Sequence, residues 1–97
     1  MDTFYQTKLK ELLTEFTRYL LENPDFAEAV PEGAQVVLLD QRDPVYSRQA
    51  MAYAARARDK DDNPRRPVVY IEVTKMRPVR SRVQELHILE HPPVYSV

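Results

Sequence analysis

The sequence has no cysteine and only one glycine, Gly33. Without cysteine the chain can form no disulfide bond, no thiolate nucleophile and no zinc site built on cysteine ligands. A P-loop or a dinucleotide-binding fingerprint needs several glycines at fixed spacing, so neither can be assembled around Gly33. No apolar run approaches the ~20 residues of a membrane-spanning helix, and no basic and then apolar leader opens the chain. We therefore expect a cytoplasmic protein that holds no cofactor and enters no membrane.

The chain is short, with 97 residues of which 43% are hydrophobic. This length predicts a single domain, 1–97, with one core. A domain of this size buries only about 60% of its unfolded surface and keeps a modest margin of stability. Self-association would add buried surface, so we expect a homodimer or a higher homo-oligomer.

The spacing of apolar residues predicts helices and strands in alternation. At the start of the chain they recur every three or four positions, which is the period of an amphipathic helix, and Thr3 with Gln6 matches a capping box. The opposite face of this helix, which includes Lys8, is expected to be solvated. The predicted elements are a helix over 3–22, a short helix over 24–30, a strand over 35–40, a helix over 44–59 and a strand over 67–75.

The order strand, helix, strand predicts a right-handed βαβ unit with parallel strands. Residues 84–89 fit two interpretations, because Ser81 with Gln84 matches a capping box while 85–88 alternate like a strand. We favour a third strand, antiparallel to the second, because two parallel strands alone make a poor sheet. The expected fold is therefore a small α/β domain, with α+β character, in which an N-terminal helix and the βαβ unit build a mixed three-stranded sheet and 91–97 form a tail.

Asp40 and Asp43 lie at the carboxyl end of the first strand, where open α/β folds place ligands. Two carboxylates there could hold Mg²⁺ or act in a carboxylate-dependent hydrolase, with one as a general base. The alternative is structural, because Asp43 followed by Pro44 is a strong helix start and Asp40 can simply end the strand. No catalytic residue is assigned, and the two aspartates are the weak metal candidates.

Basic residues gather in the second half of the chain. Residues 1–55 carry five basic and nine acidic side chains, whereas residues 56–82 carry nine basic and four acidic ones. Such cations could contact phosphates, with Tyr70 stacking on a base, or they could guard an edge strand against unwanted pairing. The nucleic-acid-binding candidates are Arg65, Arg66, Lys75, Arg77, Arg80 and Arg82.

Two further groups of residues have weaker interpretations. His87 and His91 would share one face of a helix at metal-binding distance, but in a strand they lie about 13 Å apart, and exposed histidines are expected. Tyr5 and Tyr19, on the wide apolar face of the first helix, and Tyr70 are the interface candidates. The leading hypothesis is a non-enzymatic protein that oligomerises or binds an unidentified protein partner, and nucleic-acid binding is the alternative.

Four stretches of the sequence, PEGAQVVLLD, DP, RPVVYIEV and PVRSR, occur in that order. In this order they resemble short bacterial proteins known only as a domain of unknown function, over roughly residues 8–90. The resemblance implies a small α/β protein from a bacterium, without an assigned activity. It carries no functional residue over to this chain.

Overall fold

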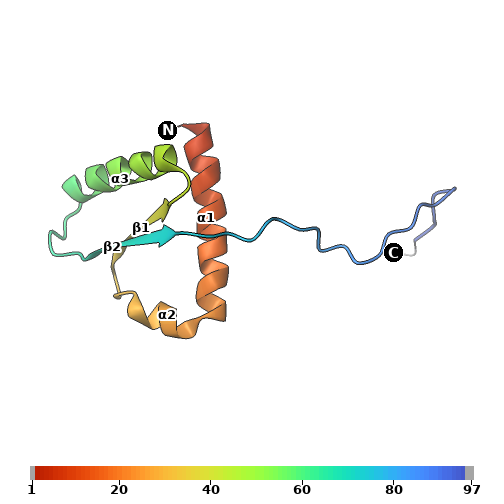
Figure 1. Ribbon diagram of the computed structural model, residues 1–97, viewed down its shortest axis with the longest axis horizontal. Coiled ribbons are helices and arrows are strands. Elements are labelled where there is room, and N and C mark those ends of the chain that lie inside the picture. The colour runs from red at the N-terminus through yellow and green to blue at the C-terminus, as the bar shows by residue number, and fades with distance from the viewer. Residues whose placement is uncertain (1, 96–97) are drawn as a thin grey trace.

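The computed structural model describes residues 2–95, in which three helices and two strands precede a long extended segment (Figure 1). Residues 2–73, called the body below, contain all five elements, and residues 74–95 form the extended segment, called the arm below. The elements are α1 (Thr3–Glu22), α2 (Pro24–Ala29), β1 (Gln35–Asp40), α3 (Pro44–Asp59) and β2 (Val68–Val73).

The N-cap residue of helix α1 lies one position earlier than the sequence motif predicts. The N–H of Phe4 donates to Asp2 Oδ1 at 2.9 Å, so Asp2 and not Thr3 supplies the N-cap oxygen. The apolar stripe of α1 faces the core of the body, and Tyr5 and Leu12 are its buried residues. None of the helices within residues 2–95 combines the length and the apolar character needed to cross a membrane.

Strands β1 and β2 pair in parallel, with α3 between them in the chain, which confirms the predicted α/β arrangement at this level. The register runs from Gln35 opposite Val68 to Asp40 opposite Val73. Gly33, in the turn before β1, has φ of 73°, a left-handed conformation that other residues rarely adopt.

The core lies where α1, α3 and β1 meet. Its buried side chains come from all three elements, and aromatic rings fill the junction between the two helices. The Tyr5 ring stacks on the Tyr46 ring with centroids 5.3 Å apart, and it lies 4.7 Å from the Tyr53 ring. The buried core residues are Tyr5, Leu12, Val37, Leu38, Tyr46 and Ala50.

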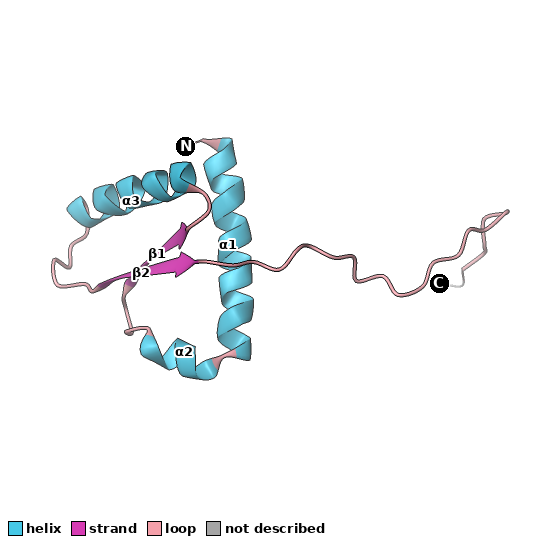
Figure 2. Ribbon diagram, in the orientation of Figure 1, coloured by secondary structure: helices cyan, strands magenta, loops and turns pink. Residues whose placement is uncertain are grey.

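The predicted third strand is absent from this single chain. Residues 84–89 have no strand pairing within residues 2–95, and the sheet has two strands, not the mixed three (Figure 2). The physical reason lies in the segment that leaves β2, because residues 74–83 contain no Gly, Asn or Asp, the residues that most readily adopt the positive φ of a tight hairpin turn. The arm therefore continues outward from β2 (Figure 1).

The arm makes the molecule long. The described chain extends 63 Å along its longest axis and has a radius of gyration of 19.4 Å, against about 13 Å for a compact chain of this length. Large apolar side chains on the arm stand in solvent, with Leu86 82% and Ile88 101% exposed. An extended segment with such exposed side chains does not stabilise the single chain through burial.

Candidate functional site

Asp40, at the end of β1, forms an ion pair with a lysine from α1. Lys8 Nζ lies 2.7 Å from Asp40 Oδ2, and Asp40 is only 8% exposed. The second carboxylate oxygen, Oδ1, accepts the backbone N–H of Arg42 at 2.9 Å. Both oxygens of this carboxylate therefore have protein partners.

The ion pair sets the protonation of both groups. Burial alone would raise the pKa of Asp40, but the hydrogen bonds from Lys8 and from the Arg42 amide outweigh it and lower that pKa. The hydrogen bond to Asp40 raises the pKa of Lys8, although burial acts in the opposite direction. At neutral pH Asp40 is therefore ionised, and the charge of Lys8 balances its own. A general base, in contrast, needs a pKa near the working pH.

Lys8 is the residue of this site that the sequence did not reveal. Its position on α1 predicts a solvated side chain, but 27% of that side chain is exposed and the ammonium reaches the end of β1. The signal in the sequence is indirect, since a carboxylate that ends a buried strand needs a cation or several donors. Which of the chain's cations meets that need depends on how α1 docks.

Asp43 caps α3, as the sequence predicts. Its Oδ1 accepts the N–H of Tyr46 at 3.0 Å, and Pro44 occupies the first turn of the helix. The two aspartates therefore belong to different structural units, one to an ion pair between elements and one to a helix start.

The outer edge of β1 is closed by two hydroxyl groups of α3. The Tyr46 hydroxyl donates to the carbonyl of Leu38 at 3.0 Å. The Ser47 hydroxyl donates to the carbonyl of Asp40 at 2.8 Å and accepts the N–H of Asp40 at 3.0 Å. These bonds occupy the carbonyl of Leu38 and both backbone groups of Asp40, which an added strand would need, so pairing is hindered along the C-terminal half of this edge of β1.

The outer edge of β2 is open. Gln35 N–H donates to the Pro67 carbonyl at 2.8 Å, and Gln41 N–H donates to the Val73 carbonyl at 3.0 Å. In both strands the odd-numbered residues therefore direct their backbone N–H and carbonyl groups toward the other strand. Because alternate residues of a strand direct their amide and carbonyl to opposite sides, the even-numbered residues of β2 face outward. Within residues 2–95 no hydrogen bond reaches the backbone of these outward residues, which are Val68, Tyr70 and Glu72.

An open hollow of about 330 Å³ lies at the carboxyl ends of the two strands. Acidic and basic side chains line it in equal number, and the closest opposite pair is the one between Lys8 and Asp40. Within residues 2–95 no group of three or more His, Asp or Glu side chains is placed to hold a metal ion. The charged lining residues are Lys8, Glu11, Asp40, Arg42, Asp43 and Lys75.

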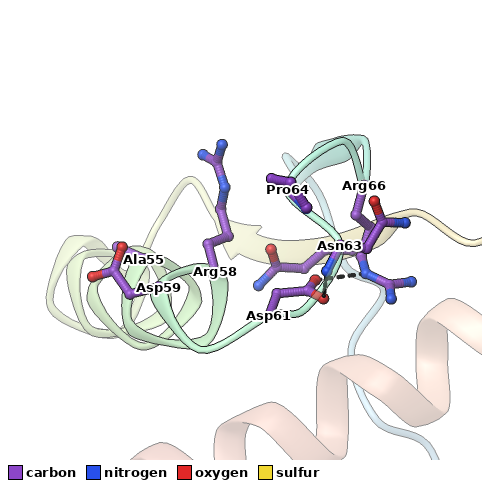
Figure 3. A pocket seen from close by; sticks show the side chains of 8 residues that line it. Ala55, Arg58, Asp59, Asp61, Asn63, Pro64 and Arg66 are labelled. Carbon is purple, nitrogen blue, oxygen red and sulfur yellow. Dashed lines mark hydrogen bonds and ion pairs between the residues drawn. The ribbon is translucent and has the colours of Figure 1, made fainter.

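A second hollow, of about 390 Å³, lies between the C-terminal part of α3 and the turn that leads to β2 (Figure 3). Arg66 Nε lies 2.6 Å from Asp61 Oδ2, and Arg66 Nη1 donates to the carbonyl of Gly33 at 2.9 Å. The hydrogen bond from Arg66 lowers the pKa of Asp61. Arg66, one of the nucleic-acid candidates, therefore ties its turn to the turn before β1.

The comparisons with known proteins decide the family. The model of the family of unknown function DUF5647 matches residues 4–86. The chain belongs to this family. The match confirms the resemblance to a domain of unknown function, and it continues beyond the body into the arm. No curated protein and no solved structure matches the chain.

In this DUF5647 member the basic candidates are divided between two places. Arg65 and Arg66 lie in the turn before β2, whereas the other four lie on the arm. Between residues 74 and 83 the arm carries no acidic residue. The arm candidates are exposed and are Lys75, Arg77, Arg80 and Arg82.

The interface candidates of this family member differ in exposure. Tyr5 is 6% exposed and packs in the core, so little of its surface is available to an interface. Tyr19 is half exposed and lies edge-on to Phe26, with centroids 5.4 Å apart. Tyr70 is 56% exposed and lies on the open edge of β2.

The two histidines lie on the exposed arm. His87 Nε2 is 3.4 Å from Glu85 Oε1, and His91 is exposed near the end of the described chain. Neither belongs to a group of potential metal ligands within residues 2–95.

Proposed function

We propose that this member of the DUF5647 family is a non-enzymatic protein that self-associates through its arm, with a homodimer as the working state. The observation that carries the proposal is the arm itself, an extended segment with large exposed apolar side chains. Burying one such side chain contributes about 1.5–3 kcal/mol. A surface that covers both Leu86 and Ile88 would therefore gain a substantial free energy of association.

The family match supports this proposal, because it extends along the arm to residue 86. The matched unit is thus the body with all four basic residues of the arm and half of its large apolar residues. The ion pair of Lys8 with Asp40 and the cap by Asp43 give the two aspartates structural roles. A body whose carboxylates serve its own fold favours a partner-binding role over a hydrolytic one.

Self-association predicts a molar mass near twice 11.4 kDa when the full chain is measured by multi-angle light scattering at micromolar concentration. Leu86→Lys with Ile88→Lys should shift the mass toward one chain, because two charges then replace the apolar surface to be buried. Val94→Lys with Tyr95→Lys adds the same charge farther along the arm and serves as the matched control. A single-chain mass of the unaltered protein at all concentrations would refute the proposal.

Nucleic-acid binding is the second candidate function, and the exposed arm cations favour it. Fluorescence anisotropy with a single-stranded oligonucleotide should show affinity that falls as salt rises, because each phosphate contact releases a counterion. Arg77→Ala, Arg80→Ala and Arg82→Ala together should weaken binding and flatten the salt dependence. The matched control removes three exposed cations from the helices, and equal binding by both triple variants would end this candidacy. The control substitutions are Lys10→Ala, Arg48→Ala and Arg58→Ala.

A further inference from the structure

We propose that two copies of this chain exchange arms, so that residues 84–89 of each copy add to the outer edge of β2 in the other copy as an antiparallel third strand. This inference rests on the self-association proposed above, and it names the two surfaces that meet. The acceptor is the open edge at Val68, Tyr70 and Glu72, and the donor is the arm.

The acceptor edge is a row of unpaired backbone groups. Each outward residue of β2 offers one N–H and one carbonyl, which an added strand can satisfy. The edge of β1 offers a shorter row, because Tyr46 and Ser47 occupy the carbonyl of Leu38 and both backbone groups of Asp40. The longer free edge for a third strand is therefore the one beside β2.

The sequence of the arm favours an extended chain that does not fold back onto its own β2. Its first ten residues, 74–83, contain no Gly, Asn or Asp, the residues that most readily adopt the positive φ of a tight hairpin turn, and Pro78 favours extended conformations for Arg77 before it. Ten extended residues span about 33 Å. Residues 84–89 are thereby carried well beyond the edge of their own β2.

The straight arm suits a twofold symmetric pair. In Figure 1 the arm continues outward from β2, away from the body. Rotation about a twofold axis perpendicular to the strand sets the arm of one copy antiparallel to β2 of the other. Both copies then use the same two surfaces, as an isologous dimer requires.

Side chains select the register of this pairing. When Ile88 lies opposite Ile71, Leu89 lies opposite Tyr70, and both pairs are apolar. In the same register His87 lies opposite Glu72, which is a polar pair. Two neighbouring registers keep the same faces. One places Glu85 opposite Glu72, and two like charges directly opposite each other destabilise a sheet. The other places Leu89 opposite Glu72 and Glu90 opposite Ile71, so that a charged side chain lies against an apolar one in both pairs. We therefore expect the first register.

The body and the arm carry net charges of opposite sign. The body carries ten basic and thirteen acidic residues, whereas the arm carries four basic and two acidic ones. Each arm therefore brings net positive charge to a partner body that is net negative, which favours exchange over repulsion between the copies.

Paired cysteines test the exchange directly, because the chain has none of its own. The full-length double variant Tyr70→Cys with Leu89→Cys is oxidised under mild conditions and run on a non-reducing gel. Opposite residues of an antiparallel pair have Cα atoms about 5.5 Å apart, which suits a disulfide. We expect the monomer band to shift to a covalent dimer with no free thiol.

The matched control is Tyr70→Cys with Ile88→Cys, in which the arm cysteine points to the other face of the sheet, and it should keep its thiols. Equal cross-linking of the two variants would overturn the proposed pairing. A monomer that contains an internal disulfide would show that the arm pairs with its own β2. Free thiols in a protein of dimer mass would refute arm exchange but retain self-association, whereas a single-chain mass would refute both.

Discussion

Replacing Asp40 by asparagine should lower the free energy of unfolding at pH 7 by about 2–3 kcal/mol. The substitution keeps the shape of the side chain but removes the charge that faces Lys8 at 2.7 Å. The ammonium of Lys8 then stands against a nearly buried neutral group, and its partial exposure to solvent moderates the cost. Urea unfolding at one fixed protein concentration measures the change, since self-association would make stability depend on concentration.

The pH dependence identifies the ion pair as the cause. The pKa of Asp40 is lowered from 3.8, so its contribution is complete above that value and is lost as pH falls through the lower folded pKa. The pKa of Lys8 is raised from 10.5, so its contribution is complete below that value and is lost as pH rises through the higher folded pKa. The difference between the unaltered protein and Asp40→Asn should therefore be constant at intermediate pH and shrink at both ends.

Asp43→Ala is the control for this experiment. It removes a helix cap and should cost about 0.5–2 kcal/mol. An Asp40→Asn protein as stable as the unaltered chain would contradict the structural role of Asp40. The carboxylate would then be free for the catalytic or metal-binding role that its position at a strand end suggests.

Tyr46→Ala should lower the free energy of unfolding by about 3–5 kcal/mol, the range for removing a large buried ring. Tyr46 is 3% exposed, stacks on Tyr5 and donates its hydroxyl to Leu38. Tyr46→Phe keeps the ring and should cost only about 1 kcal/mol for the lost hydrogen bond. Thermal or urea unfolding of the two variants separates packing from hydrogen bonding.

Alkaline titration adds an independent measurement on the same residue. Burial, followed by the nearby charges of Tyr5, Asp40 and Asp43, raises the pKa of Tyr46 to about 12. Its contribution to stability is complete below pH 10 and is lost as pH rises toward that value. Tyr46→Phe should weaken this alkaline loss, and an unchanged alkaline profile would show that the hydroxyl is not buried.

Local patterns were sufficient to predict the elements of the body. The three- and four-residue spacing that includes Tyr5 and Leu12 places α1, and Asp43 with Pro44 places the start of α3. These features depend on neighbours in the sequence, which is why they can be predicted without the fold. The cap of α1 was misplaced by one residue, because Asp2 and Thr3 are both good capping residues and only the backbone geometry decides between them.

The candidate site could be predicted only in part, because its contacts join distant segments. Asp40 could be singled out from its place after an apolar strand, but its partner Lys8 lies on another element, and side-chain periodicity alone assigns that lysine to solvent. No sequence motif marks the role of Ser47, because a hydroxyl that binds the edge of a strand has no characteristic pattern. Alternation in residues 85–88 indicates a strand, but a strand also needs a neighbour, and the single chain provides none.

The partly occupied edge of β1 limits how copies of this protein would assemble in the proposed arm exchange. Each copy has one arm to give and one free edge, that of β2, to receive it, because Tyr46 and Ser47 occupy backbone groups of Leu38 and Asp40 on the other edge. In arm exchange every copy thus has exactly two connections, and two connections make closed rings or unbranched chains. Tyr46→Phe would leave the carbonyl of Leu38 without its hydrogen bond, so that this edge of β1 could more easily accept a strand. A copy that accepts a second strand would have three connections, and branched networks would then become possible.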